Sequence, residues 1–358
     1  MFSFFKKKKG SSSNKQLSDN TYSEISESIS VSTAINSTQE INKVYSIDLN
    51  GLFIGEIILI DYLDNRLKTS APADYFAYRY GINHNNSINK LKQMGLIRIG
   101  SPSECLVGLK VPALKKILSE NKLKISGRKA ELIQRISETL DESLYTEHVS
   151  PVWKKTSRGS TITEQYSLLI WGHNNGDLSG TVSPATLLPY LNDNRPYEKI
   201  ALSLSQKEFR NKLRKLHYGM AKSELRYQIE LKEKLNLQDE VLDLLIGQAI
   251  LEFTGIQNAS SEDTIYFWER HNYSHPIKTS LINSQSRLSI DTDDILERAN
   301  IIFDAYEPHL SKTRLYKDKN EFLIALKTLL DGTENDLEIL FAKWYNRAPS
   351  FNKFDSYL

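Results

Sequence analysis

The chain has 358 residues, of which 40% are hydrophobic and 25% charged, and a formal net charge of +2; these values are typical of a folded protein with more than one domain. Its single cysteine, Cys105, excludes an internal disulfide and a thiolate zinc cluster and favours a reducing cytoplasm. The sequence contains no run of about 18 apolar residues, which excludes a transmembrane helix.

Residues 1–45 are predicted to form a disordered, basic and Ser-rich tail. In the tip, residues 1–10, phenylalanines precede four lysines, the reverse of a secretory signal. One short aromatic and basic patch binds membranes only weakly, so we do not expect membrane contact by this tip. Residues 10–45 are polar without a sustained period and carry too little apolar surface to fold.

Residues 46–100 are predicted to form a small helical segment, in which order begins within the apolar stretch 47–60. Asp74 is a candidate cap for a first helix that ends at Gly81. Ser87 is a candidate cap for a second helix that closes at Gly95. The stretch 87–97 resembles the recognition helix and following strand of winged-helix domains. A purely structural pair of helices accounts for the same residues.

In the winged-helix interpretation, three basic side chains of this segment would face DNA: Lys90, Lys92 and Arg98. In the structural interpretation, the two helices pack beside the next module and contact no ligand.

The positive charge of the chain is concentrated in residues 101–145, which we predict to be a separate module. Between Lys110 and Leu140 there are eight basic and three acidic residues, a local net charge of +5 that leaves −3 for the remainder. Such a concentrated basic stretch is typical of a surface that binds a polyanion.

The first predicted helix of this module begins near Leu109 and has Pro112 in its first turn, where a missing N–H costs nothing. Its apolar stripe recurs at spacings of three and four and consists of Val111, Leu114, Ile117 and Leu118. Asn121 is predicted to end it in the left-handed conformation.

The second predicted helix follows an extended link in which Leu123 and Ile125 are expected to fill the small core. Ser126 is the predicted N-cap, which places Gly127, Arg128 and Lys129 in the first turn. The free N–H groups and the positive end of the helix dipole favour an anion there. The return stripe toward the first helix is Leu132, Ile133, Ile136 and Leu140.

The stretch 109–136 closely resembles the SAP family, small helix–linker–helix (helix-turn-helix) DNA-binding modules. The most diagnostic residues are Leu123 and the run 125–133, Ile-Ser-Gly-Arg-Lys-Ala-Glu-Leu-Ile. Two departures are Lys122, where the family often has Gly, and Lys124, where it often has Pro. The wider region, 80–173, is similar to SAP-containing proteins of low-GC Gram-positive bacteria and their mobile elements.

The resemblance implies DNA contact by Ser126, Gly127, Arg128 and Lys129, supported by Lys124 and Arg135. The basic pair on the first helix completes the predicted DNA-binding set: Lys115, Lys116, Lys124, Ser126, Gly127, Arg128, Lys129 and Arg135. A module of this size neutralises about 3–5 phosphates, so the logarithmic salt slope is expected to be about −3 to −4. No set of base-reading residues is recognisable within it.

The remainder is predicted as a mixed α/β segment, residues 146–205, and a helical C-terminal domain, residues 206–358. Residues 166–171 have high β-propensity and precede a polar turn over 172–177. Three-to-four-residue periodicity predicts helices within 206–256, 294–306 and 321–344.

Candidates for catalysis or metal binding have simpler structural interpretations. His271 and His275 have a zinc-like spacing but lack a third ligand close in sequence, and His173 with Asp177 fits a polar hairpin. The acidic stretch 291–294 fits a helix cap better than a calcium loop. Cys105 lacks a neighbouring base and is expected to be unreactive, and Trp268 and Trp344 are expected in the core. We therefore predict no catalytic residue, metal or cofactor.

Together these observations predict a mainly α protein with a minor β component, in which the SAP-like module precedes a mixed segment and the helical domain. The expected function is largely non-specific binding of duplex DNA backbone in the cytoplasm, associated with the nucleoid. The C-terminal helices are expected to bind a protein partner or to form a homodimer. The alternative is a metal-dependent nuclease to which the module delivers DNA.

Overall fold

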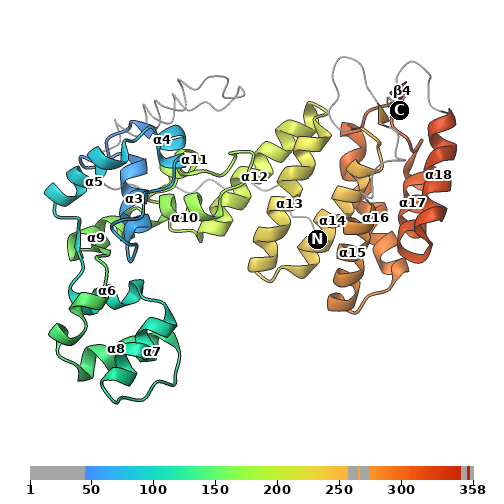
Figure 1. The fold of residues 1–358 in the computed structure, drawn as a ribbon. Coiled ribbons are helices and arrows are strands. Elements are labelled where there is room, and N and C mark those ends of the chain that lie inside the picture. Colours follow the sequence, from blue (N-terminus) through green and yellow to red (C-terminus); the bar gives the residue numbers. More distant parts are fainter. Residues whose placement is uncertain (1–44, 257–264, 267–273, 348–352, 355–358) are drawn as a thin grey trace. The chain divides into compact units, whose positions relative to one another are not determined.

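The computed structural model describes residues 45–256, 265–266, 274–347 and 353–354. The chain is mainly α-helical with a minor β part, as the sequence predicts (Figure 1). The described residues divide into two compact units, the first within residues 45–170 and 185–192 and the second within residues 171–184 and 193–354. Among the described residues, no helix combines the length and the apolar composition needed to cross a membrane. The predicted N-terminal tail and its tip lie outside the described residues.

The first unit is built around one buried helix, α3 (Ile54–Leu63), which is apolar on nearly every side. A helix without a polar face must be covered all round. The helices α4 (Tyr75–Tyr80), α5 (His84–Gln93) and α9 (Ser157–Gln165) pack against it, as does the strand β2 (Trp153–Lys155).

One carboxylate inside this unit, that of Glu56 on α3, fixes the position of α5. Its side chain is only 4% exposed. It accepts hydrogen bonds from Ser87 Oγ at 3.2 Å and Lys90 Nζ at 2.6 Å, and Oε2 also accepts from the Phe53 N–H at 3.0 Å. A buried carboxylate requires such partners, because an unpaired charge is costly away from water.

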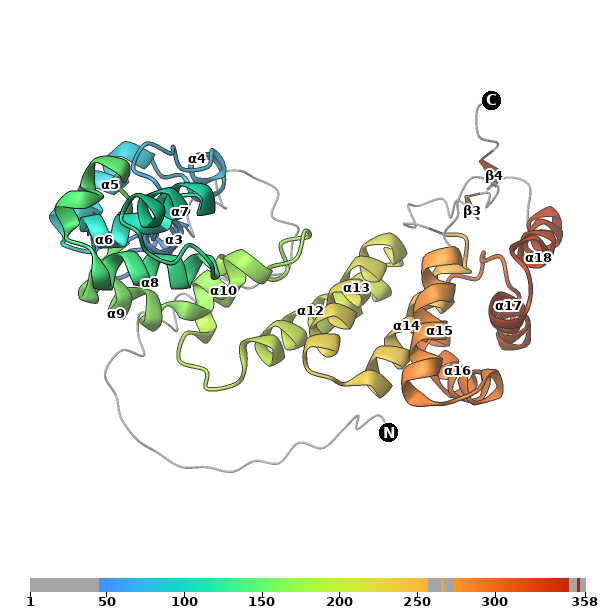
Figure 2. The same cartoon turned by 60° about the horizontal axis from the view of Figure 1, so that its bottom comes forward.

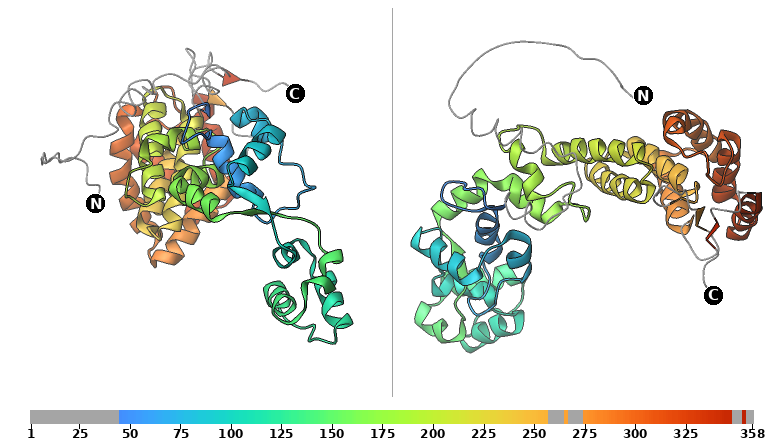
Figure 3. Two further views of the ribbon diagram at one scale, coloured as in Figure 1. Left: turned by 90° about the vertical axis from the view of Figure 1, so that its left-hand side faces the viewer. Right: turned by 90° about the horizontal axis from the view of Figure 1, so that it is seen from above.

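The β part of this unit is a small antiparallel arrangement. Strand β1 (Ile97–Ile99) pairs with β2 in the register Ile97–Lys155 to Ile99–Trp153. On the other side of β2, Leu67 forms a bridge to Val152, flanked by a hydrogen bond from the Asn65 N–H to the Trp153 carbonyl at 2.8 Å. Residues 100–152, which include the predicted basic module, are thus inserted between two paired strands (Figure 3).

The second unit consists largely of consecutive helices that pack on their neighbours in the chain (Figures 1 and 2). Their shared core includes Tyr218, Phe253, Phe303 and Phe341. The helices are α12 (Tyr197–Arg214), α13 (Tyr218–Lys234), α14 (Gln238–Glu252), α15 (Ser274–Leu288), α16 (Thr292–Tyr306), α17 (Lys319–Asp331) and α18 (Glu334–Arg347). The two short strands β3 (Ile265–Tyr266) and β4 (Lys353–Phe354) pair in parallel. The boundary predicted at 205/206 falls within α12.

Buried charges in the second unit are paired. Glu224 is fully buried and accepts from Lys212 Nζ at 2.6 Å and from Thr181 Oγ1 at 2.7 Å. Lys222 and Glu252, both almost fully buried, form a second pair. These pairs satisfy charges that the helix packing removes from water.

Several local predictions are wrong. Asn83, rather than Ser87, caps α5, because its side chain accepts from the Asn86 N–H while Ser87 lies buried against Glu56. Residues 167–175 form the helix α10 (Ser167–Asn175) instead of a strand followed by a hairpin turn. Packing decides this segment, since Leu168 and Leu169 are buried and a short apolar run is compatible with either conformation.

Other local predictions are confirmed. Gly81 follows α4 with a φ of 67°, the left-handed conformation expected after a helix. Asp291 caps α16 through the Asp294 N–H at 2.9 Å. Trp344 lies in the core, as predicted. His271 and Trp268 lie outside the described residues.

The Glu56 contacts generate a stability prediction. Replacing Glu56 by Ala removes the acceptor of both Ser87, which is buried, and Lys90. The free energy of unfolding should therefore fall by about 1–3 kcal/mol. Urea denaturation measures it. The matched control, Glu164→Ala, removes an exposed carboxylate from α9 and should change stability by less than about 0.5 kcal/mol. Equal effects of the two substitutions would contradict the role assigned to Glu56.

Candidate nucleic-acid interface

The predicted basic module forms two helices, α7 (Val111–Glu120) and α8 (Lys129–Thr139), which pack together (Figure 2). Pro112 lies in the first turn of α7, as predicted. Both predicted apolar stripes contribute to one small core, which confirms the helical periodicity. Its buried members are Leu106, Leu114, Ile117, Leu118, Leu132, Ile136 and Tyr145.

The end of α7 differs from the prediction by one residue. Asn121 has a φ of −97°, and Lys122 takes the left-handed conformation, with a φ of 59°. The Lys122 N–H donates to the Ser119 carbonyl at 3.0 Å and the Leu123 N–H to the Leu118 carbonyl at 2.8 Å. These bonds satisfy carbonyls that the helix end would leave free. The left-handed conformation of Lys122 favours glycine, the residue that the SAP resemblance often has at this position.

The two apolar residues of the linker, Leu123 and Ile125, differ in whether they contact the core. Leu123 packs against the core as predicted, whereas Ile125 is 47% exposed and does not fill it. The side chain of Arg135 occupies the linker side of α8 and donates to the carbonyl oxygens of Lys124 and Ser126, the latter at 3.1 Å. Hydrogen bonds donated by the Arg135 side chain to these carbonyls therefore hold the linker, and Ile125 adds no apolar contact to the core.

The start of α8 is also shifted. Arg128 is the N-cap and Lys129 the first helical residue, so the prediction that Ser126 caps the helix is wrong. The Arg128 N–H donates to the Glu131 carboxylate at 3.2 Å. Gly127 has a φ of 132°, and a Cβ there would lie 2.5 Å from Glu131 Oε2. Glycine is favoured at this turn because residues other than glycine rarely adopt this positive φ.

Consequently the helix start carries a carboxylate of its own, which sequence analysis did not weigh. The N-terminal N–H groups attract an anion, and Glu131 at the third helical position supplies one. Binding of an external polyanion then depends on the exposed cations around the linker.

The predicted DNA-binding residues fall into two groups. Lys115, Lys124 and Arg128 are exposed and have no ion-pair partner among the described residues, and Lys116 is 3.8 Å from Glu120 with both side chains half-exposed or more. Ser126 and Gly127 are exposed, and the Ser126 carbonyl accepts from Arg135.

Lys129 and Arg135 form the second group, because both contact the protein itself. Lys129 Nζ donates to the Val107 carbonyl at 2.6 Å, and Arg135 binds the linker carbonyls. Sequence alone does not distinguish Lys129 and Arg135 from the cations of the first group, since all carry the same charge in the same short stretch.

A short segment before α7 joins the module to the paired strands. It comprises α6 (Pro102–Cys105) and the 3₁₀ turn η1 (Leu106–Gly108). Ser101 and Glu104 form a reciprocal capping box at its start. The spacing Ser-x-x-Glu, which sequence analysis did not use, predicts this helix start.

Two of the three cations predicted to face DNA in a winged helix are paired. Arg98 on β1 donates to both carboxylate oxygens of Glu104, at 2.6 and 2.8 Å, and Lys90 contacts Glu56. Lys92 is exposed. Within the described part of the chain, no three His, Cys, Asp or Glu side chains are close enough to hold a metal ion together.

The match to known families covers the two helices, their linker and the preceding turn. Residues 105–141 match the SAP domain. The match supports DNA binding in general, and we refer to these residues as the SAP module. No curated protein matches the chain.

The left-handed Lys122 provides a test of the linker geometry. Lys122→Gly should raise the free energy of unfolding by about 0.5–1 kcal/mol, because glycine adopts this conformation without steric cost. The matched control is Lys115→Gly within α7, which should lower it by about 1 kcal/mol. Thermal or urea denaturation distinguishes the two signs. Destabilisation by Lys122→Gly would contradict the assigned backbone conformation.

The Arg98–Glu104 pair predicts a pH dependence. Hydrogen bonds from Arg98 lower the pKa of Glu104 from 4.5 to about 2. The pair therefore stabilises the protein above about pH 4.5, and its contribution is lost as the pH falls through 2. The side chains are 48% and 30% exposed, which limits the contribution to about 1 kcal/mol.

Urea denaturation of the wild type and Glu104→Gln at about pH 5 and pH 3 measures this effect. The difference in stability between the two proteins should be smaller at the lower pH. A difference that grows on acidification would contradict the assigned pair.

Proposed function

We propose that the protein binds duplex DNA through the SAP module, mainly by contacts to the phosphate backbone. The observation that carries this proposal is that three cations of the predicted DNA-binding set are exposed and have no ion-pair partner among the described residues: Lys115, Lys124 and Arg128. Lys124 and Arg128 flank the exposed residues Ser126 and Gly127, where a phosphate can approach closely. A cationic side chain that has no partner within the protein can bind a phosphate without breaking an internal contact, so little free energy is lost on binding.

In this proposal Lys129 and Arg135 act indirectly. Lys129 anchors the start of α8 to η1, and Arg135 holds the carbonyls of the linker. Both orient Lys124 and Arg128 without having to touch DNA. The partly paired Lys116 adds to the positive potential of the module.

Binding is expected to be largely independent of base sequence within the SAP module, because phosphate contacts carry no sequence information. A DNA-bound protein lies where the DNA is, so we propose a nucleoid-associated location. Partner binding or homodimerisation through the helices of residues 206–358 stays a prediction, as does the similarity to bacterial and mobile-element proteins.

The proposal is tested by fluorescence anisotropy of the full chain with a duplex over a salt series. The wild type should show a logarithmic slope of about −3 to −4, and Lys124→Ala/Arg128→Ala should bind more weakly with a slope smaller in magnitude by about 2. The matched control removes one exposed lysine and one exposed arginine from α12, in Lys207→Ala/Arg210→Ala. It should retain the wild-type slope. Equal loss in both double variants would contradict a role specific to the SAP module.

A further inference from the structure

The first unit contains a second pair of helices with the geometry of a DNA-reading element. α4 ends at Tyr80 and α5 begins at His84, so only three residues separate them, and the first is the left-handed Gly81. Two helices joined by a three- or four-residue turn with glycine form the helix-turn-helix motif, whose second helix enters the major groove.

The elements around this pair follow the order of a winged helix. α3 is followed by a turn segment that contains the bridge residue Leu67, then by α4, α5, β1 and β2. Residues 65–68 pair with β2 through the Leu67–Val152 bridge, and β2 pairs with β1. The hairpin that would form the wing, between β1 and β2, is replaced by residues 100–152. The SAP module therefore occupies the position of the wing.

The outer face of α5 has an unusual composition. α5 has no acidic residue. Its exposed side chains are four amides and one lysine: Asn85, Asn86, Asn89, Gln93 and Lys92. At 100° per residue, these five fall within roughly a third of the helix circumference. The opposite face is fixed to α3, since Leu91 is fully buried and Ser87 contacts Glu56.

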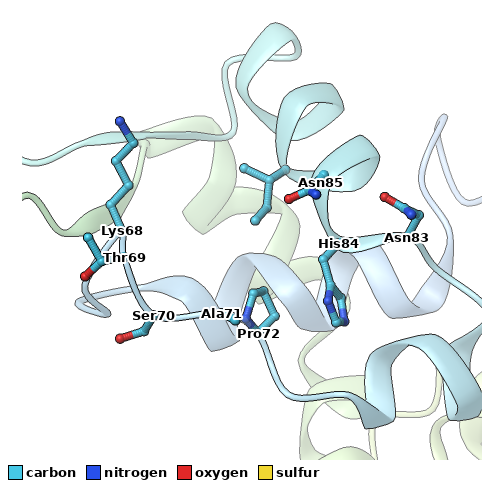
Figure 4. Close-up of a pocket in the computed structure, with 9 residues that line it drawn as sticks. Lys68, Thr69, Ser70, Ala71, Pro72, Asn83, His84 and Asn85 are labelled. Atoms are coloured by element: carbon cyan, nitrogen blue, oxygen red, sulfur yellow. The ribbon is translucent and has the colours of Figure 1, made fainter.

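None of these five side chains has a hydrogen-bond or ion-pair partner among the described residues. Side-chain amides bind adenine in the major groove with paired hydrogen bonds to N6 and N7, and the groove is wide enough for an α-helix. A cavity of about 330 Å³ adjoins the first turn of α5 and is lined by Asn85, Asn83 and the loop from Lys68 to Pro72 (Figure 4). Exposed Lys68 gives this end of the helix a cation for the DNA backbone.

We infer that α5 is a recognition helix that reads adenine-containing sequence in the major groove, while the SAP module at the wing position contacts the adjacent backbone. The inference extends the proposed DNA binding, because it assigns sequence preference to a different part of the chain. It also differs from the winged-helix interpretation of the sequence, in which Lys90 and Arg98 would face DNA, since both are paired internally and the amides are exposed.

The test is selection of bound sequences by the full chain from a pool of random duplexes. The wild type should enrich a motif that contains adenine, and Asn85→Ala/Asn89→Ala should lose that preference by about fivefold to a hundredfold while retaining non-specific affinity. Gln165→Ala removes an exposed amide from α9 and should retain the motif. Lack of any enriched motif in the wild-type pool, or the same motif in the double variant, would overturn the inference.

A charge variant provides a second readout. Asn89→Asp places a carboxylate against the DNA and should weaken binding to the selected duplex by about tenfold. Unchanged affinity would show that α5 lies away from DNA. Lys124→Ala/Arg128→Ala separates the two proposals, because it should weaken binding to all duplexes and leave the selected motif intact. If that variant binds normally while the α5 variants do not, the SAP proposal fails and the inference about α5 stands.

Discussion

The antiparallel pairing of β1 with β2 is the constraint on which the first unit depends. It joins Ile97–Ile99 to Trp153–Lys155 and so brings together residues that are more than fifty positions apart in the chain. Everything between the strands must form a module whose two ends meet, which a compact helix–linker–helix core satisfies. The same pairing places Val152 against Leu67 and thereby links α3, α5 and α9 to the point where the module begins.

Attachment of the module at this point rests on a few polar contacts and close packing. Arg98 on β1 binds Glu104 on α6, and Gly108 lies so close to Leu67 that a Cβ there would be 3.0 Å from its Cδ2. Lys129 then connects α8 to η1. The cations near the strands, Arg98 and Lys129, have partners within the protein, whereas Lys124 and Arg128 at the linker have no ion-pair partner among the described residues. Positively charged side chains thus have two roles in this unit. Those with an acceptor within hydrogen-bond distance hold the module in place, and those without one can bind an external anion.

The helices of the SAP module were predictable because their information is local. Pro112 and the two apolar stripes act over three or four residues, and each is found where expected. The errors concern residues at which two local solutions compete. Lys122 takes the left-handed position predicted for Asn121, and Arg128 replaces Ser126 as N-cap, because Glu131 reaches back to the Arg128 N–H.

The amino-acid sequence by itself determined the mainly α class, the position of the SAP module and the concentration of positive charge within it, since periodicity and net charge are properties of neighbouring residues. Only the tertiary structure decided which cations contact the protein itself, that α10 is a helix, and that the module is inserted between paired strands. These features depend on contacts between distant segments: Arg135 with the linker, Arg98 with Glu104, and Val152 with Leu67. A sequence pattern over neighbouring residues does not predict such contacts, because they form only when folding brings the two segments together.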